Sequence, residues 1–424
     1  MRVYLDTVGC RLNQAEIEAM ASQFRAAGHE IVPAAEGADL AVVNTCSVTA
    51  KAAADSRSMM RRLARRGVGE LVATGCWATL RPAGAAALPQ VRRVVPNSSK
   101  DQLVAQVLGK TAATPGKRTA RMPLPGLRRR TRAFIKVQDG CDNRCTFCVT
   151  TIARGTGRSR PTTEVVADVL GAVRGGAKEI VLSGVHLGSW GRDLGLHLRD
   201  LIDALLGETE ARRVRLSSLE PWDLDTSFFE RWADRRLCGH FHLPLQSGCD
   251  QTLRRMGRPT TRESFRTLVA AAREVVPQAA ITTDLIAGFP GETEQEFSAS
   301  LDFVREMEFA GGHVFTYSPM SGTAAARMPA QVPMDERRRR NRLLREALAQ
   351  SARQYRRRHV GANRDVLWES ARRGGRGKWM LSGLTHDYLR VRATADGPRW
   401  NQIDTVVLRE ATENELLGVI VKSG

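Results

Sequence analysis

The chain has 424 residues, of which 42% are hydrophobic and 26% charged, and its formal net charge is +19. This length and composition are those of a globular protein and predict two to four domains with a large buried core. The sequence shows neither a signal-like N-terminus nor an apolar run of about 18 residues. It therefore argues against secretion and membrane insertion and predicts a cytoplasmic protein.

Residues 1–112 are predicted to form an N-terminal α/β domain around a parallel sheet. Short apolar runs predict its strands at residues 3–8, 40–45, 70–75 and 92–96. A helical stretch over residues 13–28 ends at Gly28, and glycine is typical of helix C-termini. Strands that alternate with helices imply parallel pairing.

Residues 113–132 follow as a basic linker, because they are rich in Pro, Gly, Thr and Arg and lack hydrophobic periodicity. From residue 133 to residue 358 the alternation resumes. Six candidate strands lie at residues 133–138, 179–185, 213–219, 240–246, 280–289 and 313–318. Helical stretches separate them, and a very basic helix over residues 335–358 closes the region. Six βα units predict a partial (βα)6 barrel.

Residues 359–424 change to short alternating strands and turns, which predict a small C-terminal antiparallel β-barrel, a common format for nucleic-acid binding. Positive charge is concentrated in runs, since residues 116–136 contain no acid at all. Residues 336–346, 355–359 and 372–378 form further arginine-rich runs. Such runs predict a polyanionic partner, RNA or DNA, whereas their lack of an amphipathic apolar face disfavours a membrane surface.

Three of the eight cysteines stand close together just after the first barrel strand: Cys141, Cys145 and Cys148, hereafter the loop trio. Clustered thiols in a reducing compartment more often bind metal or carry out chemistry than form disulfides. Three ligands suit a zinc ion with one open position or a cubic iron–sulfur cluster with one iron uncovered. Zinc ribbons usually bring two C-x-x-C pairs, and the sequence offers no second pair, so zinc is the second choice.

A second set of cysteines is dispersed in sequence: Cys10, Cys46 and Cys76, hereafter the strand-end trio. Each one follows the end of a predicted strand, and the ends of parallel strands meet at one edge of a sheet, where ligands bind. Any one of them alone would be read as a small buried hydrophobic residue. Their repeated topological position predicts a shared metal site, flanked by Asn13 and Asn44, which are expected to cap helices or turns.

The other predicted strand ends of the barrel are rich in Gly, Ser, Gln and Glu. These segments are residues 183–191, 217–221, 245–250 and 288–297. Active sites of α/β barrels lie at the C-terminal ends of strands, and glycines there let the backbone approach a ligand closely. Together the four segments predict a bound small molecule at the barrel mouth.

These motifs resemble a known family. The C-x3-C-x2-C loop, with Phe147 before its last cysteine, resembles the signature of radical S-adenosylmethionine (SAM) enzymes. "TVGCRLNQAEIE", "NTCSVTAKAAADSR" and "ATGCWA" resemble the N-terminal domain of the methylthiotransferases, and "RGTGRSRP", "SSLEP", "HLPLQSG", "DLIAGFPGET" and "YSPMSGT" resemble their catalytic barrel. "GLTHDYLRV" resembles a TRAM domain, an RNA-binding module. The resemblance covers nearly the whole chain, and "GCRLNQAE" and "NTCSVT" are most similar to the MtaB-type branch.

The resemblance implies two 4Fe–4S clusters with SAM as the second cofactor. The loop trio would hold a cluster whose open iron binds the amino and carboxyl groups of SAM, so that an electron cleaves SAM to a radical. That radical would take the hydrogen from carbon 2 of an adenine. The strand-end trio would hold a second cluster that carries the sulfur group to be transferred.

The resemblance also implies residues of the SAM pocket. By analogy with the family they are Gly184, Ser217, Glu220 and Gln246. Arg154 and Arg158 are candidates for contacts to SAM or phosphate, with solvated surface residues as the alternative.

For the substrate, the resemblance implies N6-threonylcarbamoyladenosine beside the anticodon in the tRNA anticodon stem-loop. It also implies an electron donor such as a flavodoxin or ferredoxin, and a sulfur donor. Isopentenyladenosine in tRNA and an aspartate of a ribosomal protein are alternatives, and a zinc-bearing RNA-binding protein without catalysis is an alternative of another class. Thr151 stands where the family usually has proline, and Met320 and Ser321 stand where Arg-Pro is common. These departures leave the fine substrate assignment open.

Overall fold

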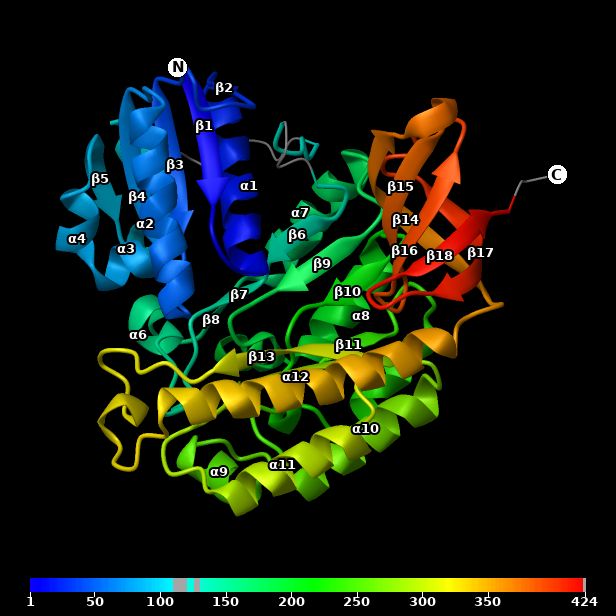
Figure 1. The fold of residues 1–424 in the computed structure, drawn as a ribbon. Coiled ribbons are helices and arrows are strands. Elements are labelled where there is room, and N and C mark those ends of the chain that lie inside the picture. The colour runs from blue at the N-terminus through cyan, green and yellow to red at the C-terminus, as the bar shows by residue number, and fades with distance from the viewer. Residues whose placement is uncertain (110–119, 126–129, 422–424) are drawn as a thin grey trace. The chain divides into compact units, whose positions relative to one another are not determined.

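The computed structural model describes residues 1–109, 120–125 and 130–421 (Figure 1). The chain divides into two compact units. The first unit is Met1–Ala177, Leu182–Glu210 and Ser318–Ala326, and the second is Lys178–Val181, Ala211–Tyr317 and Arg327–Gly424. Most of the predicted linker, residues 113–132, lies outside the described residues. The domain boundaries expected at residues 112, 132 and 358 stay predictions.

The first unit begins with a five-stranded parallel sheet of order β2-β1-β3-β4-β5. Its strands are β1 (Arg2–Thr7), β2 (Glu30–Ile31), β3 (Leu40–Thr45), β4 (Glu70–Gly75) and β5 (Val91–Val95). All six residues of β3 are buried, because this central strand is covered on both faces, as its unbroken apolar run indicates. The predicted parallel α/β domain is confirmed.

Helices cover both faces of this sheet (Figure 1). They are α1 (Arg11–Ala26), α2 (Ala50–Arg65), α3 (Cys76–Leu80), α4 (Pro82–Ala86) and α5 (Leu103–Val107). The alternation of side chains along β1 sends Val3 into a core cluster with α1 and α5, and Tyr4 into another with α2 and α3. A hydrophobic layer on each face of the sheet therefore fixes the positions of its strands and of the residues at their ends.

The rest of the first unit carries the loop trio and the helices that follow it. Its elements are β6 (Ala133–Lys136), β7 (Gln138–Asp139), α6 (Thr150–Arg154), β8 (Arg158–Ser159), α7 (Thr162–Arg174) and α8 (Leu198–Glu208). The predicted strand 133–138 is interrupted at Val137. The Val137 amide donates to the Ser183 carbonyl at 2.9 Å. β7 and β8 then pair antiparallel on either side of the loop trio and α6.

The second unit holds the later barrel strands and their helices. The strands are β10 (Val214–Leu216), β11 (His240–His242), β12 (Ala280–Ala287) and β13 (Gly311–Thr316), and β9 (Ile180–Ser183) is divided between the units. The helices are α9 (Asp250–Arg255), α10 (Arg262–Val275), α11 (Glu294–Glu306) and α12 (Met334–Arg357). β11, β12 and β13 form a parallel sheet. Strands that alternate with helices confirm the predicted partial (βα)6 architecture.

The chain ends in a closed five-stranded barrel of order β14-β15-β16-β18-β17. Its strands are β14 (Asn363–Arg373), β15 (Trp379–Thr385), β16 (Arg390–Ala395), β17 (Ile403–Ala411) and β18 (Leu416–Ile420). Four of its strand pairs are antiparallel, as predicted, but β16 and β18 pair parallel and thereby close the barrel. Trp368 is fully buried in its core, which also includes Ala280 and Tyr355 from the preceding part of the second unit.

Within the described residues, no helix combines the length and the apolar character that crossing a membrane requires.

Candidate functional site

The strand-end trio lies at one edge of the N-terminal sheet. Cys10 follows β1, Cys46 follows β3, and Cys76 begins α3 directly after β4, and these three strands are neighbours in the sheet. Gly9 has φ +106°, and a Cβ added to it would lie 2.6 Å from the Cys46 Sγ, so the loop after β1 passes directly over that thiol. The structure thus brings the predicted cysteines to one edge, as strand-end topology indicates.

The thiols of this trio are close enough to affect the pKa of Cys46. Burial, with smaller contributions from the neighbouring thiols of Cys10 and Cys76, raises the pKa of Cys46 to about 11. A thiol with such a pKa is protonated at neutral pH and becomes a thiolate when a metal displaces its proton. The Cys46 thiol is therefore not an activated nucleophile.

Asparagines fix the loops around the strand-end trio. Asn13 lies in the first turn of α1, and its Nδ2 donates to the carbonyls of Val8 (2.8 Å) and Thr45 (3.2 Å). Its Oδ1 accepts a hydrogen bond from the Cys10 thiol at 3.7 Å. The sequence indicated only a cap for Asn13, whereas the structure shows a bridge between the loops that follow β1 and β3.

Asn97 is a further member of this shell that sequence reasoning missed. Its Nδ2 donates to the Cys76 Sγ at 3.7 Å and to the Ala153 carbonyl at 2.8 Å. One buried side chain thus connects the strand-end trio with α6. The only sequence signal was a polar residue after the last strand of the sheet.

A buried ionic network lies next to the strand-end trio. The Glu16 carboxylate forms ion pairs with the Lys100 Nζ at 2.8 Å and with the Arg154 Nη1 at 2.9 Å. All three side chains are 2% exposed. Arg154 also donates to the Asp139 carboxylate at 2.8 Å and to the Asn13 Oδ1 at 2.9 Å. Burial alone would raise the pKa of Glu16, but Lys100 and Arg154 hold it well below its usual range. The carboxylate is therefore ionised and fully paired.

This network corrects the role expected for Arg154 and connects its cations with Cys76. Arg154 was a candidate contact to SAM or phosphate, but its guanidinium is buried and occupied by Glu16, Asp139 and Asn13. Lys100 and Arg154 both interact electrostatically with Cys76. The buried network and the strand-end trio are therefore in electrostatic contact at Cys76.

The loop trio lies between β7 and α6, and its three residues are partly buried. The Cys141 amide donates to the Gly155 carbonyl, and the Cys148 amide to the Cys145 carbonyl, each at 3.0 Å. Backbone amides donate to two of the sulfurs at 3.4 Å, from Asn143 to Cys141 and from Thr150 to Cys148. Amide donors of this kind stabilise metal-bound thiolates.

The loop trio is joined to the rest of the first unit through β7. Gly140 has φ +72°, and an added Cβ would lie 1.8 Å from the Thr156 carbonyl oxygen, so only glycine fits there. The Gln138 side chain donates to the Gly140 carbonyl at 2.8 Å and accepts from the His186 amide at 2.9 Å. Gln138, which sequence reasoning did not single out, therefore links the loop trio with the turn that contains Gly184.

Within the described residues, no three His, Cys, Asp or Glu side chains are close enough to hold a single metal ion. A cubic cluster has separate irons at its corners, so its three ligands stand farther apart than the ligands of one ion. In the loop trio the thiols accept hydrogen bonds from backbone amides. In the strand-end trio they lie beside buried cations. Thiolates are ligands of both zinc ions and iron–sulfur clusters, so these donor sets suit a thiolate-bound metal group.

The four predicted SAM-pocket residues are divided between the units. In the first unit, Gly184 approaches Gln138 so closely that an added Cβ would lie 2.9 Å from its Oε1. In the second unit, Ser217 is buried, and its hydroxyl has no hydrogen-bond partner among the described residues. Glu220 is paired with Arg258 at 2.7 Å, and Gln246 adopts the left-handed φ of +71°. Ser217 thus offers the free polar group that a ligand would need.

The three departures from the family pattern lie on segments that meet in the first unit. Thr151 belongs to α6, next to Ile152, whose side chain is half exposed. A Cβ added at Gly322, directly after Met320 and Ser321, would lie 3.2 Å from the Ile152 Cδ1. The Ala325 amide donates to the Thr146 carbonyl inside the loop trio at 2.9 Å. The departures are therefore one local feature beside the loop trio rather than separate ones.

Comparisons with known proteins agree with this arrangement. Residues 2–95 match the family described as uncharacterized protein family UPF0004, and residues 135–304 match the radical SAM superfamily. A solved structure of TsrM from Kitasatospora setae, a radical S-adenosylmethionine methyltransferase with tryptophan and a SAM analogue bound, aligns with a TM-score of 0.59. The alignment covers 77% of this chain and 75% of that chain at 16% identity, which shows a shared fold.

Curated relatives match most of the chain. The threonylcarbamoyladenosine tRNA methylthiotransferase MtaB of Thermotoga maritima is 36% identical over 376 residues, which cover 87% of this chain and 86% of that protein. MtaB of Bacillus subtilis is 34% identical over 404 residues, covering 92% and 89%. The tRNA-2-methylthio-N(6)-dimethylallyladenosine synthase of Erythrobacter litoralis is 35% identical over 399 residues, covering 88% and 87%.

Proposed function

The chain belongs to the MtaB-type branch of the radical SAM methylthiotransferases, and we propose that it transfers a methylthio group to carbon 2 of N6-threonylcarbamoyladenosine beside the tRNA anticodon. The observation that carries this proposal is the similarity, over most of both chains, to relatives named for that reaction. Family membership makes the chain an enzyme, which sets aside the alternative of a non-catalytic zinc-bearing protein.

Radical SAM enzymes use SAM and a 4Fe–4S cluster, and we assign that cluster to the loop trio. We assign a second 4Fe–4S cluster to the strand-end trio. When bound, the first group supplies the electron that cleaves SAM, and the second supplies the sulfur that is transferred. Three cysteines in each set leave one iron open for a further ligand, which both roles require.

The chain's own residues prepare these positions. Lys100 and Arg154, which are paired with Glu16, lie close enough to Cys76 to interact with it electrostatically. The Gln138 side chain holds the loop trio and the turn at Gly184 in a fixed relation. We propose that Gly184, Ser217, Glu220 and Gln246 line the SAM pocket. The unpartnered hydroxyl of buried Ser217 supports this assignment.

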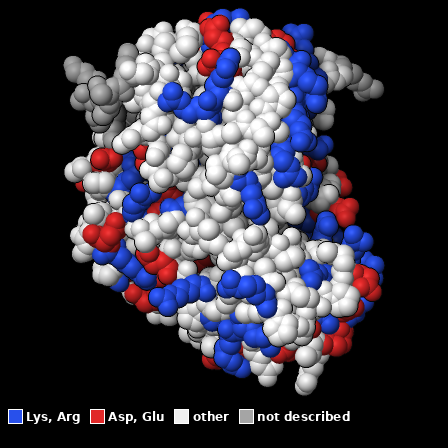
Figure 2. Space-filling view, turned by 90° about the vertical axis from the view of Figure 1, so that its left-hand side faces the viewer, with Lys and Arg blue, Asp and Glu red and all other residues white. Residues whose placement is uncertain are grey.

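The partner is tRNA, bound through its anticodon stem-loop, and the positive charge supports it. Figure 2 shows one face on which Lys and Arg gather in a band down the upper right-hand side, while Asp and Glu form smaller separate groups. Not all basic residues are available, because Arg337 and Arg340 of the basic helix α12 are buried. Arg340 pairs with Glu292 at 2.9 Å. The basic linker, the exposed arginines of α12 and the C-terminal barrel remain as phosphate contacts.

Two further proteins and a location complete the proposal. An electron donor such as a flavodoxin or ferredoxin would serve the group held by the loop trio, and a sulfur donor would serve the group held by the strand-end trio. The enzyme works in the cytoplasm, where its tRNA substrate is found. The expected division into residues 1–112, 113–132, 133–358 and 359–424 separates sulfur delivery, linker, radical chemistry and RNA binding.

A second candidate substrate is isopentenyladenosine in tRNA, since the Erythrobacter litoralis relative is named for the dimethylallyl substrate and is also 35% identical. A ribosomal protein aspartate is the third, and it is disfavoured by the net charge of +19. Mass spectrometry of tRNA nucleosides from a deletion strain separates these candidates. We expect loss of the 2-methylthio form of N6-threonylcarbamoyladenosine only, with recovery from a plasmid copy but not from its Cys141→Ala variant. An unchanged level in the deletion strain contradicts the proposal.

The two-cluster assignment has its own test. Anaerobic reconstitution of the wild-type chain is expected to give about eight irons per chain. Replacing the three cysteines of either trio by alanine is expected to leave about four. A wild-type value of about four, or a loop-trio variant that keeps all its iron, overturns the assignment.

A further inference from the structure

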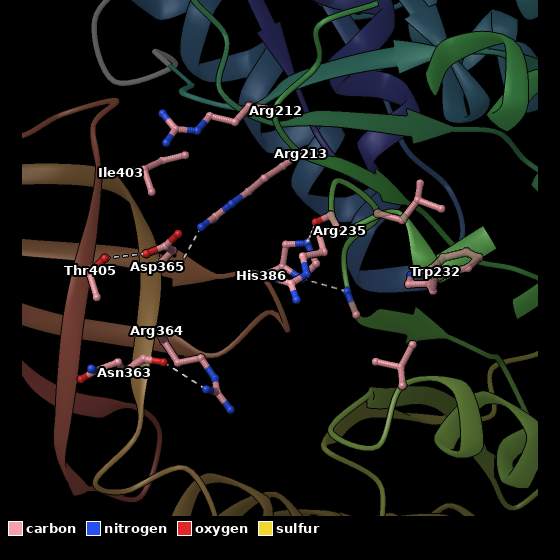
Figure 3. A pocket seen from close by; sticks show the side chains of 13 residues that line it. Arg212, Arg213, Trp232, Arg235, Asn363, Arg364, Asp365, His386, Ile403 and Thr405 are labelled. Atoms are coloured by element: carbon pink, nitrogen blue, oxygen red, sulfur yellow. Dashed lines mark hydrogen bonds between the residues drawn. The ribbon is translucent and has the colours of Figure 1, made fainter. Parts of the chain in front are cut away.

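A basic cavity of about 600 Å³ lies within the second unit (Figure 3). Its walls come from segments that precede barrel strands and from the C-terminal barrel. Arg212 lies just before β10, Gly239 just before β11, and Thr405 on β17. Ser217 and Gln246, by contrast, follow β10 and β11. The cavity is therefore at the N-terminal ends of the strands, whereas the proposed SAM pocket is at their C-terminal ends.

The lining carries four arginines against a single carboxylate: Arg212, Arg213, Arg235, Arg364 and Asp365. The Asp365 carboxylate accepts a hydrogen bond from the Thr405 hydroxyl at 2.8 Å, and among the described residues it forms no ion pair with these arginines. Apolar residues such as Trp232 and Ile403 complete the wall. A concave, partly apolar site with converging cations suits an anionic ligand of nucleotide size.

Two of the arginines hold the cavity together. The Arg213 side chain is 5% exposed, and its guanidinium donates to the carbonyls of Asp365 (2.8 Å) and Leu384 (3.4 Å). Arg364 donates to the Asn363 carbonyl at 3.0 Å and lies 3.8 Å from the Asp387 carboxylate. Arg213 precedes β10, and Arg364 also donates to the Gln278 side chain just before β12, so both guanidiniums connect the C-terminal barrel with the rest of the second unit and are not free for a ligand.

The other two arginines are available. Arg212 and Arg235 are exposed, and among the described residues neither guanidinium has a hydrogen-bond or ion-pair partner. Figure 3 shows the Arg212 side chain extending from the core toward the barrel strand that carries Ile403. Arginines that line a cavity without a carboxylate partner present their donors to whatever enters it.

His386 also lines the cavity, next to Arg235 and Gly239. The His386 Nε2 donates to the Arg235 carbonyl at 3.1 Å, and its Nδ1 accepts from the Gly239 amide at 3.2 Å. This pairing needs a neutral ring. Burial, with smaller contributions from the nearby cations Arg213 and Arg215, lowers the pKa of His386 to about 4. His386 is therefore neutral at physiological pH, and the positive charge of the cavity wall comes from its arginines.

The frame around the cavity is rigid. Arg215 is fully buried, paired with Glu179 at 2.7 Å, and lies over the Tyr388 ring at 4.9 Å. Tyr388 also stacks on His240 with ring centroids 4.4 Å apart. The cavity is therefore part of a packed interface within the second unit, with a shape that is set before a ligand binds.

We propose that this cavity binds the phosphate backbone of the tRNA substrate, with Arg212 and Arg235 as the direct phosphate contacts. The inference rests on the proposed function, and it adds an RNA contact remote from the chemistry. Its neighbour is a closed barrel that resembles an RNA-binding module, which favours RNA over a free anion. Phosphate contacts of this kind supply affinity and register without reading sequence.

The test compares tRNA binding by wild type and by the double variant Arg212→Gln, Arg235→Gln across a range of salt concentrations. We expect binding about tenfold weaker, and a plot of log affinity against log salt whose slope is smaller by about 2, one unit for each lost phosphate contact. The double lysine variant keeps the charge and is expected to keep most of the slope. Iron content and SAM cleavage in the absence of tRNA stay unchanged. Neither arginine is close in sequence to the two cysteine trios, and neither belongs to the proposed SAM pocket.

The matched control is Arg266→Gln with Arg305→Gln, which removes two exposed arginines on α10 and α11 that pair with acids outside the cavity. We expect its affinity and slope to stay close to wild type. If wild type does not bind tRNA, the proposed function fails and takes this inference with it. If wild type binds but the double variant binds equally well with the same slope, the cavity inference alone is overturned. Binding of inorganic phosphate without any change in tRNA affinity overturns it as well.

Discussion

Arg154 beside the strand-end trio and Arg212 in the basic cavity use the same side chain in opposite ways. Arg154 is 2% exposed and is enclosed by Glu16, Asp139 and Asn13. Arg212 is exposed and has no partner among the described residues. The first is a structural cation whose charge is already neutralised inside the protein. The second carries charge that is available to a partner, so a count of arginines overstates the surface that can bind RNA.

The largest expected effect follows from breaking the buried network. Arg154→Ala leaves Glu16 and Asp139 buried with one cation fewer, and it should lower the free energy of unfolding by about 3–5 kcal/mol. Urea denaturation measures this loss. Arg158→Ala, an exposed neighbour four residues on, is the control and should stay within about 0.5 kcal/mol of wild type. Equal effects of the two variants would contradict the distinction.

A smaller effect is expected from acid at the basic cavity. The folded pKa of His386 is about 4, below its ordinary value of 6.5, so the unfolded chain binds the proton more readily. The corresponding stability is present above pH 6.5 and is lost as pH falls toward 4. Between pH 6.5 and 5 the loss is about 2 kcal/mol. Urea denaturation at each pH should show this loss in wild type and less of it in His386→Gln. The same pH dependence in both proteins would refute the assignment.

The smallest expected effect on stability is at Arg212. Arg212→Gln removes an exposed, unpaired cation that lies near three other arginines, so the free energy of unfolding should change by no more than about 0.5 kcal/mol. Any change should be an increase, because repulsion is relieved. Thermal unfolding alongside the tRNA titration checks this. A destabilisation comparable to that of Arg154→Ala would mean that Arg212 is structural too.

Patterns that are local in sequence predicted the elements well. Apolar alternation located β1, β3 and β4, and strand-end topology brought Cys10 and Cys46 to one edge. Side-chain partners were not predictable, because they depend on residues far apart in the chain. Lys100 meets Glu16 across 84 positions, and nothing near either residue indicates the pair.

The same limit applies to the cavity and to the C-terminal barrel. Arg213 donates to the Asp365 carbonyl across 152 positions, so the basic cavity has no signature in any single segment. The parallel pairing of β16 with β18 was missed because short alternating strands specify a sheet face but not the direction of a neighbour. The predicted SAM-pocket residues and the cluster assignment remain predictions for the iron and nucleoside experiments above.

The chain from Cys10 through Asn13 and Arg154 to Asp139, two residues before Cys141, is continuous hydrogen bonding inside one unit. It sets the spacing between the two cysteine trios by protein contacts alone. The relative position of the two trios is therefore a property of the folded first unit, fixed by its own side chains.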